Sequence, residues 1–83
     1  MSNLSLYSNI EEAYSEYIID GKLDKFQKVL EATVNAMEGV SRENTQILKE
    51  ILNDIDYTSF MYSNDEQPAQ VDIALNKLRN LFK

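Results

Sequence analysis

The sequence predicts an all-α fold, a compact bundle of three to four short antiparallel helices. Two observations lead to this prediction. Apolar residues recur at the three- and four-residue spacing that places them on one side of a helix. Only two glycines and one proline interrupt the 83 residues, too few for the frequent turns of a β fold. The length allows one domain, which we expect to span residues 1–83.

The first helix is expected over about residues 8–20. Ser8 and Glu11 have the spacing of a capping box, in which each side chain accepts a hydrogen bond from a backbone N–H at the helix start. Gly21 can adopt the left-handed conformation that often ends a helix. The apolar stripe of this helix is expected to contain Ile10, Ala13, Tyr14, Tyr17 and Ile18.

The second helix is expected over about residues 22–38 and the third over about residues 42–61. Gly39 is expected to end the second helix in a Schellman motif, with Val40 folded back onto the last turn. Ser41 is expected to cap the third helix. The apolar row of the second helix is Leu23, Phe26, Leu30, Thr33 and Met37, and that of the third is Ile47, Leu48, Ile51, Leu52 and Ile55.

The fourth helix is expected over about residues 67–82, because Pro68 is tolerated in a first turn. Asn64 and Asp65 are its candidate caps. The segment before them is either an extension of the third helix or a loop, and its apolar spacing favours extension to about Met61. The apolar stripe of the fourth helix is Val71, Ala74, Leu75, Leu78, Leu81 and Phe82. The residues expected to be deeply buried are Leu30, Ile51, Leu52, Leu75 and Leu78.

The chain contains no histidine and no cysteine, the side chains most used for proton transfer, nucleophilic attack and zinc binding near neutral pH. Its acidic residues fall mainly on expected polar faces, where they are solvated. Asp54 and Asp65 have the outer spacing of a calcium loop, but Ser59 stands where glycine makes the sharp turn. The sequence therefore predicts a binding protein rather than an enzyme, with no catalytic residues, no cofactor and no metal site.

The formal net charge of −6 disfavours binding to nucleic acid and to anionic membranes. Lys22, Lys25 and Lys28 share one side of the second helix, which leaves a small DNA-binding regulator as a less favoured alternative. No stretch resembles a signal peptide or approaches the roughly 20 apolar residues of a membrane span. We therefore expect a cytoplasmic protein that binds neither nucleic acid nor a membrane.

An aromatic cluster beside acidic residues is the best indication of function. Aromatic residues and methionine are enriched at the centres of protein interfaces, because they bury much area with few rotatable bonds. Carboxylates around them can steer a basic partner. In one alternative the same cluster closes a homodimer, and in another its aromatic side chains plug the bundle. The predicted partner-binding residues are Asp54, Asp56, Tyr57, Phe60, Met61, Tyr62 and Asp65.

No motif in the chain identifies a family. In size, charge and helix count the chain resembles small bacterial helical bundles, such as bacteriocin immunity proteins and secretion or flagellar chaperones. That resemblance implies a protein that occludes or stabilises a partner surface, as an immunity protein, inhibitor, chaperone or adaptor does. Overall properties carry the resemblance, so it assigns no functional residues.

Overall fold

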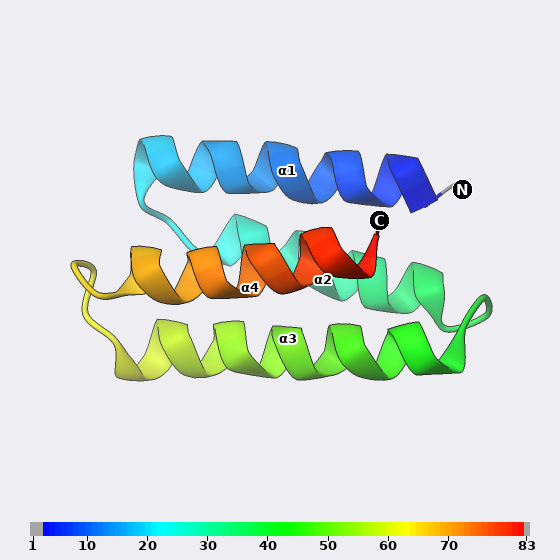
Figure 1. The fold of residues 1–83 in the computed structure, drawn as a ribbon. Coiled ribbons are helices and arrows are strands. Elements are labelled where there is room, and N and C mark those ends of the chain that lie inside the picture. The colour runs from blue at the N-terminus through cyan, green and yellow to red at the C-terminus, as the bar shows by residue number, and fades with distance from the viewer. Residues whose placement is uncertain (1–2, 83) are drawn as a thin grey trace.

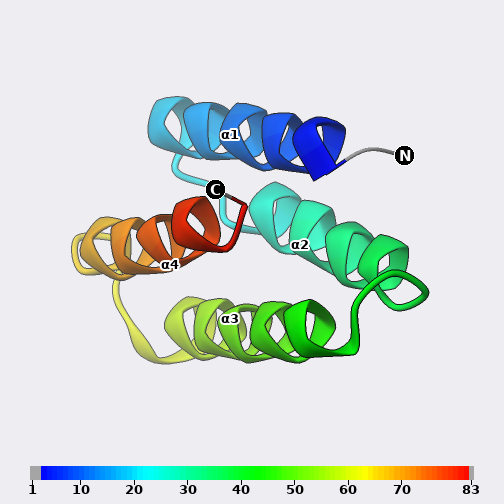
Figure 2. The same cartoon turned by 45° about the vertical axis from the view of Figure 1, so that its right-hand side comes forward.

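A computed structural model describes residues 3–82 of the chain, with their side chains from residue 5 onward. Within these residues the secondary structure is helical, without strands, so the all-α prediction is confirmed. Each helix runs antiparallel to the one before it (Figure 1), and α1 contacts both α2 and α4, which in turn contact α3 (Figure 2). The helices are α1 (Asn3–Asp20), α2 (Asp24–Met37), α3 (Arg42–Met61) and α4 (Gln67–Leu81).

The core lies along the centre of this bundle, where each helix contributes its apolar stripe. Of the five residues expected to be deeply buried, Leu30, Ile51, Leu75 and Leu78 are buried, whereas Leu52 is half-buried at the edge of the core. The predicted rows of α2 and α4 hold, because their three- and four-residue spacing turns one side of each helix inward. The largest side chains that are almost wholly buried are Phe26, Ile10, Leu30, Met37, Leu48, Ile55 and Leu78.

The start of α1 differs from the prediction. The helix begins at Asn3, so Ser8 lies inside it, exposed, and the expected cap at Ser8 is wrong. The physical reason is Leu6, which is 6% exposed and extends the buried stripe of α1 by one turn. Ile18 is also wrongly placed by the sequence pattern, since it is exposed in a shallow depression beside Pro68 at the end of the bundle.

The turns on either side of α2 end their helices in different ways. Gly21 is left-handed, with φ 72°, and its N–H donates to the Tyr17 carbonyl at 2.8 Å, as predicted. Gly39 is not left-handed and Val40 is exposed, so the Schellman motif is wrong. The N–H groups of Val40 and Ser41 instead both donate to the Met37 carbonyl, at 2.9 and 3.1 Å.

The predicted cap of α3 is confirmed, whereas the predicted caps of α4 are wrong. Ser41 caps α3 as predicted, because its Oγ accepts the N–H of Asn44 at 3.2 Å. α3 extends to Met61, which confirms the predicted extension. Neither Asn64 nor Asp65, the two candidate caps of α4, is its cap. The Ser63 carbonyl instead accepts the N–H groups of Glu66 and Gln67, each at 3.0 Å.

Within residues 3–82, no helix combines the length and the apolarity that crossing a bilayer requires.

Candidate functional site

α1 and α3 end, and α4 begins, at the same end of the bundle (Figure 1). Most of the large hydrophobic residues that are exposed belong to the segments near this end. Of the seven large hydrophobic residues that are exposed in the described part of the chain, only Val40 lies at the opposite end. Ile18 and Ile19 belong to the last turn of α1. The other four form what we call the aromatic patch: Tyr57, Phe60 and Met61 on α3 and Ile73 on α4.

The patch is exposed because of the register of α3. The buried side of this helix is defined by Leu48, Ile51, Ile55 and Thr58. At about 100° per residue, Phe60 falls on the opposite side, and its side chain is 86% exposed. The alternative in which Phe60 and Tyr62 plug the bundle is therefore wrong for Phe60, whereas Tyr62 is half-buried. The helix presents the ring of Phe60 to solvent.

The aromatic patch continues into a depression between α3 and α4. The rings of Tyr57 and Tyr62 meet edge to face, with centroids 6.2 Å apart and an interplanar angle of 73°. Ile73 of α4 lines the same depression. Sequence reasoning missed Ile73, although an apolar residue outside the predicted stripe of its helix was a usable signal.

The three predicted carboxylates lie at different places around the patch. Asp54 pairs with Lys77 of α4 at 3.4 Å, and both side chains are more than half exposed. Asp56 faces α2, where its Oδ1 accepts a hydrogen bond from Nε2 of Gln27 at 2.8 Å. Asp65 is exposed in the turn before α4. These side chains surround the patch rather than converge on one point.

The charge of the chain is concentrated in this region. Residues 50–72 contain six of the 14 acidic residues and none of the eight basic ones, so the remaining residues contain eight of each. The net charge of −6 therefore equals the charge of this segment, which contains the three α3 residues of the aromatic patch. Elsewhere acidic and basic residues are equal in number, and Lys25 of the predicted basic side of α2 pairs with Glu16 of α1.

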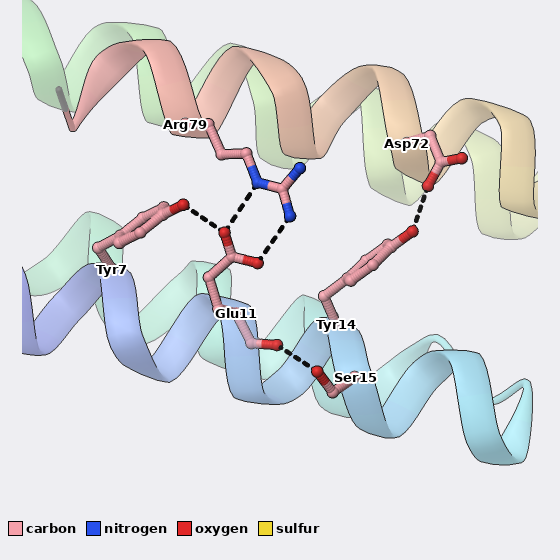
Figure 3. Close-up of polar contacts among 6 residues, drawn as sticks. All are labelled: Tyr7, Glu11, Tyr14, Ser15, Asp72 and Arg79. Atoms are coloured by element: carbon pink, nitrogen blue, oxygen red, sulfur yellow. Dashed lines mark hydrogen bonds and ion pairs between the residues drawn. The ribbon is translucent and has the colours of Figure 1, made fainter.

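A second polar cluster joins α1 to α4 (Figure 3). The guanidinium of Arg79 donates to both carboxylate oxygens of Glu11, at 2.8 and 3.1 Å, and the hydroxyl of Tyr7 donates to the same carboxylate. The hydroxyl of Tyr14 donates to Asp72. Sequence reasoning missed this cluster, because Glu11 and Arg79 are 68 positions apart.

The protonation states of the residues in this second cluster favour the contacts between α1 and α4. Hydrogen bonds from Arg79 hold the pKa of the Glu11 carboxyl below its usual value, so the group stays ionised. The hydrogen bond to Asp72 raises the pKa of the Tyr14 phenol, which keeps it protonated. In both cases the favoured protonation state is the one that forms the contact between α1 and α4.

Among residues 3–82, no three acidic side chains come close enough together to hold a metal ion. Comparisons of the chain with protein-family models, with curated proteins and with solved structures found no match. The exposure, shape and charge of the aromatic patch are therefore the basis for inferring what this protein does.

Proposed function

We propose that this chain is an acidic helical protein-binding module, which acts by occluding or stabilising a surface of a partner protein. The observation that carries the proposal is the aromatic patch of Tyr57, Phe60, Met61 and Ile73, exposed at one end of the bundle. Grouped exposed apolar side chains on a small globular protein are a mark of an interaction site. Burying one such side chain against a partner contributes about 1.5–3 kcal/mol.

The partner that fits this patch has a basic surface. Because residues 50–72 contain six acidic residues and no basic one, a positively charged partner is attracted to the patch from a distance. The same electrostatic field repels an acidic partner before contact. The module supplies no catalytic group of its own in this proposal, and it acts in the cytoplasm as an immunity protein, inhibitor, chaperone or adaptor.

The test is a pair of variants at opposite ends of the bundle. The partner is captured from the native organism, identified by mass spectrometry and purified. Its affinity is then measured for the unchanged chain, for Phe60→Ser combined with Tyr62→Ser, and for the control Val40→Ser. We expect the double variant to bind at least about tenfold more weakly and the control to bind normally. A folded double variant that binds with undiminished affinity would exclude the patch.

The alternative is a homodimer closed by the same patch. Bringing two copies of the segment 50–72 together would oppose six carboxylates with six others, and this repulsion favours a basic partner instead. Light scattering over a range of concentrations distinguishes the two functions. A monomer at all concentrations supports a separate partner, whereas a mass that doubles, and that Phe60→Ser returns to one chain, supports self-association.

A further inference from the structure

Residues 3–82 contain two methionines, and these lie in opposite environments. Met37 of α2 belongs to the core and is 1% exposed, whereas Met61 is the last residue of α3 and is 56% exposed. Met61 is part of the aromatic patch, beside Phe60 and one helical turn after Tyr57. Because the chain contains no cysteine, methionine thioethers are the sulfur groups that an oxidant meets.

We propose that Met61 is a reversible oxidation site, at which a peroxide converts the thioether to methionine sulfoxide and so weakens binding of the partner to the aromatic patch. This inference rests on the proposed function, since it names a regulation of the same site. Two features of the structure support it. Met61 is accessible to a small oxidant, and it lies within the apolar surface that the partner covers.

The reaction is a two-electron oxidation of the Met61 sulfur. A lone pair of the sulfur attacks one oxygen of hydrogen peroxide, so that an S–O bond forms while the O–O bond breaks. The sulfur is oxidised and the peroxide is reduced. The departing hydroxide takes the proton of the transferred oxygen and leaves as water. Susceptibility follows exposure, so the fold admits the peroxide to Met61 and shields Met37.

Oxidation at this position alters the patch rather than the core. Met61 belongs neither to the core nor to the partly buried residues packed against it, so its sulfoxide should leave the bundle folded. Tyr57 and Met61 are four positions apart on α3 and are 57% and 56% exposed, which places them side by side on one surface. A sulfoxide oxygen there is a strong acceptor that loses its water when an apolar surface covers it.

The same exposure allows the oxidation to be reversed. Methionine sulfoxide reductases return the sulfoxide to the thioether, and such an enzyme must reach the oxidised side chain. Met61 at the end of α3 is accessible to an enzyme without unfolding of the bundle, whereas Met37 is not. The position therefore suits a switch rather than permanent damage.

The first measurement tests the site without a partner. The folded chain is treated with dilute hydrogen peroxide and then digested with trypsin, which places Met37 and Met61 in separate peptides, residues 29–42 and 50–77. We expect Met61 to gain an oxygen atom at least about tenfold faster than Met37, as measured by mass spectrometry. In urea the two rates should become similar. Equal rates in the folded chain, or a difference that persists in urea, would overturn the inference.

The second measurement uses the purified natural partner. The unchanged chain and Met61→Leu are each treated with peroxide, freed of it by catalase, and compared with their untreated forms. Met61→Leu keeps the other two methionines, so it reveals any effect of oxidation elsewhere. We expect oxidation to weaken binding of the unchanged chain at least about threefold and to leave binding of Met61→Leu unaltered.

Reduction completes this measurement. Methionine sulfoxide reductases should restore the affinity of the oxidised unchanged chain. Thermal unfolding followed by circular dichroism should be the same before and after oxidation, which separates an altered patch from an unfolded bundle. An equal loss of binding in the unchanged chain and in Met61→Leu, or no loss in either, would overturn the inference.

Failure of this inference can be separated from failure of the proposed function. If Phe60→Ser with Tyr62→Ser loses binding while the chain oxidised at Met61 binds normally, the patch binds the partner but oxidation does not regulate it. If the folded double variant binds with undiminished affinity, both proposals fall. Loss of binding in the double variant and in the oxidised chain, with Met61→Leu unaffected by peroxide, supports both.

Discussion

The two sides of α4 differ in the contacts that their exposed side chains make. On the side facing α1, Asp72 and Arg79 are engaged by Tyr14 and by Glu11 (Figure 3), and the ring of Phe82 lies 5.9 Å from that of Tyr7. On the side facing α3, Ile73 is exposed and one weak ion pair crosses the seam. Polar contacts bridge the surface of the α1–α4 seam, which we call the closed seam. The α3–α4 seam, where the two helices pack more closely, has few such contacts at its surface, and we call it the open seam.

The contrast indicates how a chain of 83 residues can hold its helices together and still expose apolar side chains. A domain of this size buries a modest share of its surface, so most contacts at its seams are needed for stability. Here the bidentate Arg79–Glu11 pair and two tyrosine hydroxyls hold α1 in place. The exposed apolar residue at the surface of the other seam, Ile73, is then available for contact with a partner.

The largest expected effect comes from the core beneath both seams. Leu78 is fully buried on the inner side of α4. Leu78→Ala removes buried methyl groups and leaves a cavity, so the free energy of unfolding should fall by about 2–5 kcal/mol. Urea unfolding followed by circular dichroism measures it. A loss below about 1 kcal/mol would mean that α4 is not seated as described.

The stability contributed by the closed seam should depend on pH. Glu11→Gln removes the carboxylate that accepts from Arg79, so it should lower stability at pH 7 by less than Leu78→Ala does. Because the pKa of Glu11 is lowered in the folded protein, its contribution is fully present above the unfolded value of 4.5 and is lost as pH falls through the folded value.

The measurement is the difference in unfolding free energy between the unchanged chain and Glu11→Gln from pH 7 to pH 3. We expect a constant difference down to about pH 5 and a shrinking one below it. Glu12→Gln is the matched control, because Glu12 is an exposed neighbour on the same helix. A difference that does not vary with pH would disprove the role of the Glu11 carboxylate at this seam.

A smaller effect tests how the closed seam is built. Tyr7 reaches Glu11 and Phe82 from the second turn of a helix that begins at Asn3, and Ser8 lies within that helix. Ser8→Ala should therefore change stability by no more than about 0.5 kcal/mol, in the stabilising direction, since alanine has the higher helix propensity. A loss of about 1 kcal/mol, as for a lost cap, would place the helix start at Ser8.

The smallest expected effect is at the open seam. Phe60→Ser and Ile73→Ser should each change the free energy of unfolding by no more than about 0.5 kcal/mol, because both side chains are at least half exposed. Thermal unfolding compared with the unchanged chain checks this. A marked destabilisation would show that the patch supports the bundle, and the contrast between the two seams would disappear.

Much of this architecture could be predicted from local pattern alone. The apolar repeats of α2, α3 and α4 and the Ser41 cap depend on residues close together in the sequence. The start of α1 was predicted wrongly, because Ser8 and Glu11 have the spacing of a capping box, whereas the burial of Leu6 depends on contacts that form only in the folded bundle. Gly39 was misread because a glycine after a helix permits a left-handed turn without requiring one.

The candidate site was only partly accessible to sequence reasoning. Tyr57, Phe60 and Met61 stood out as aromatic and apolar residues at a point where the pattern weakened, and the structure finds all of them exposed. Ile73 and Lys77 join them through the packing of α4 on α3, which no local pattern encodes. The polar contacts of the closed seam could not be predicted for the same reason, because residues such as Glu11 and Arg79 meet only after folding.

The confinement of the net charge to residues 50–72 has a consequence for how this protein meets another molecule. With the rest of the chain neutral in sum, the centre of charge is displaced from the centre of mass, and the molecule carries a permanent electric dipole. In the field of a cationic body it experiences a torque as well as an attraction. The torque should turn the aromatic end toward the cationic body before the two surfaces touch. A larger fraction of encounters should then begin in the correct orientation. Added salt should remove that alignment at distances beyond about 10 Å, at 0.1 M ionic strength, while leaving the final contact intact.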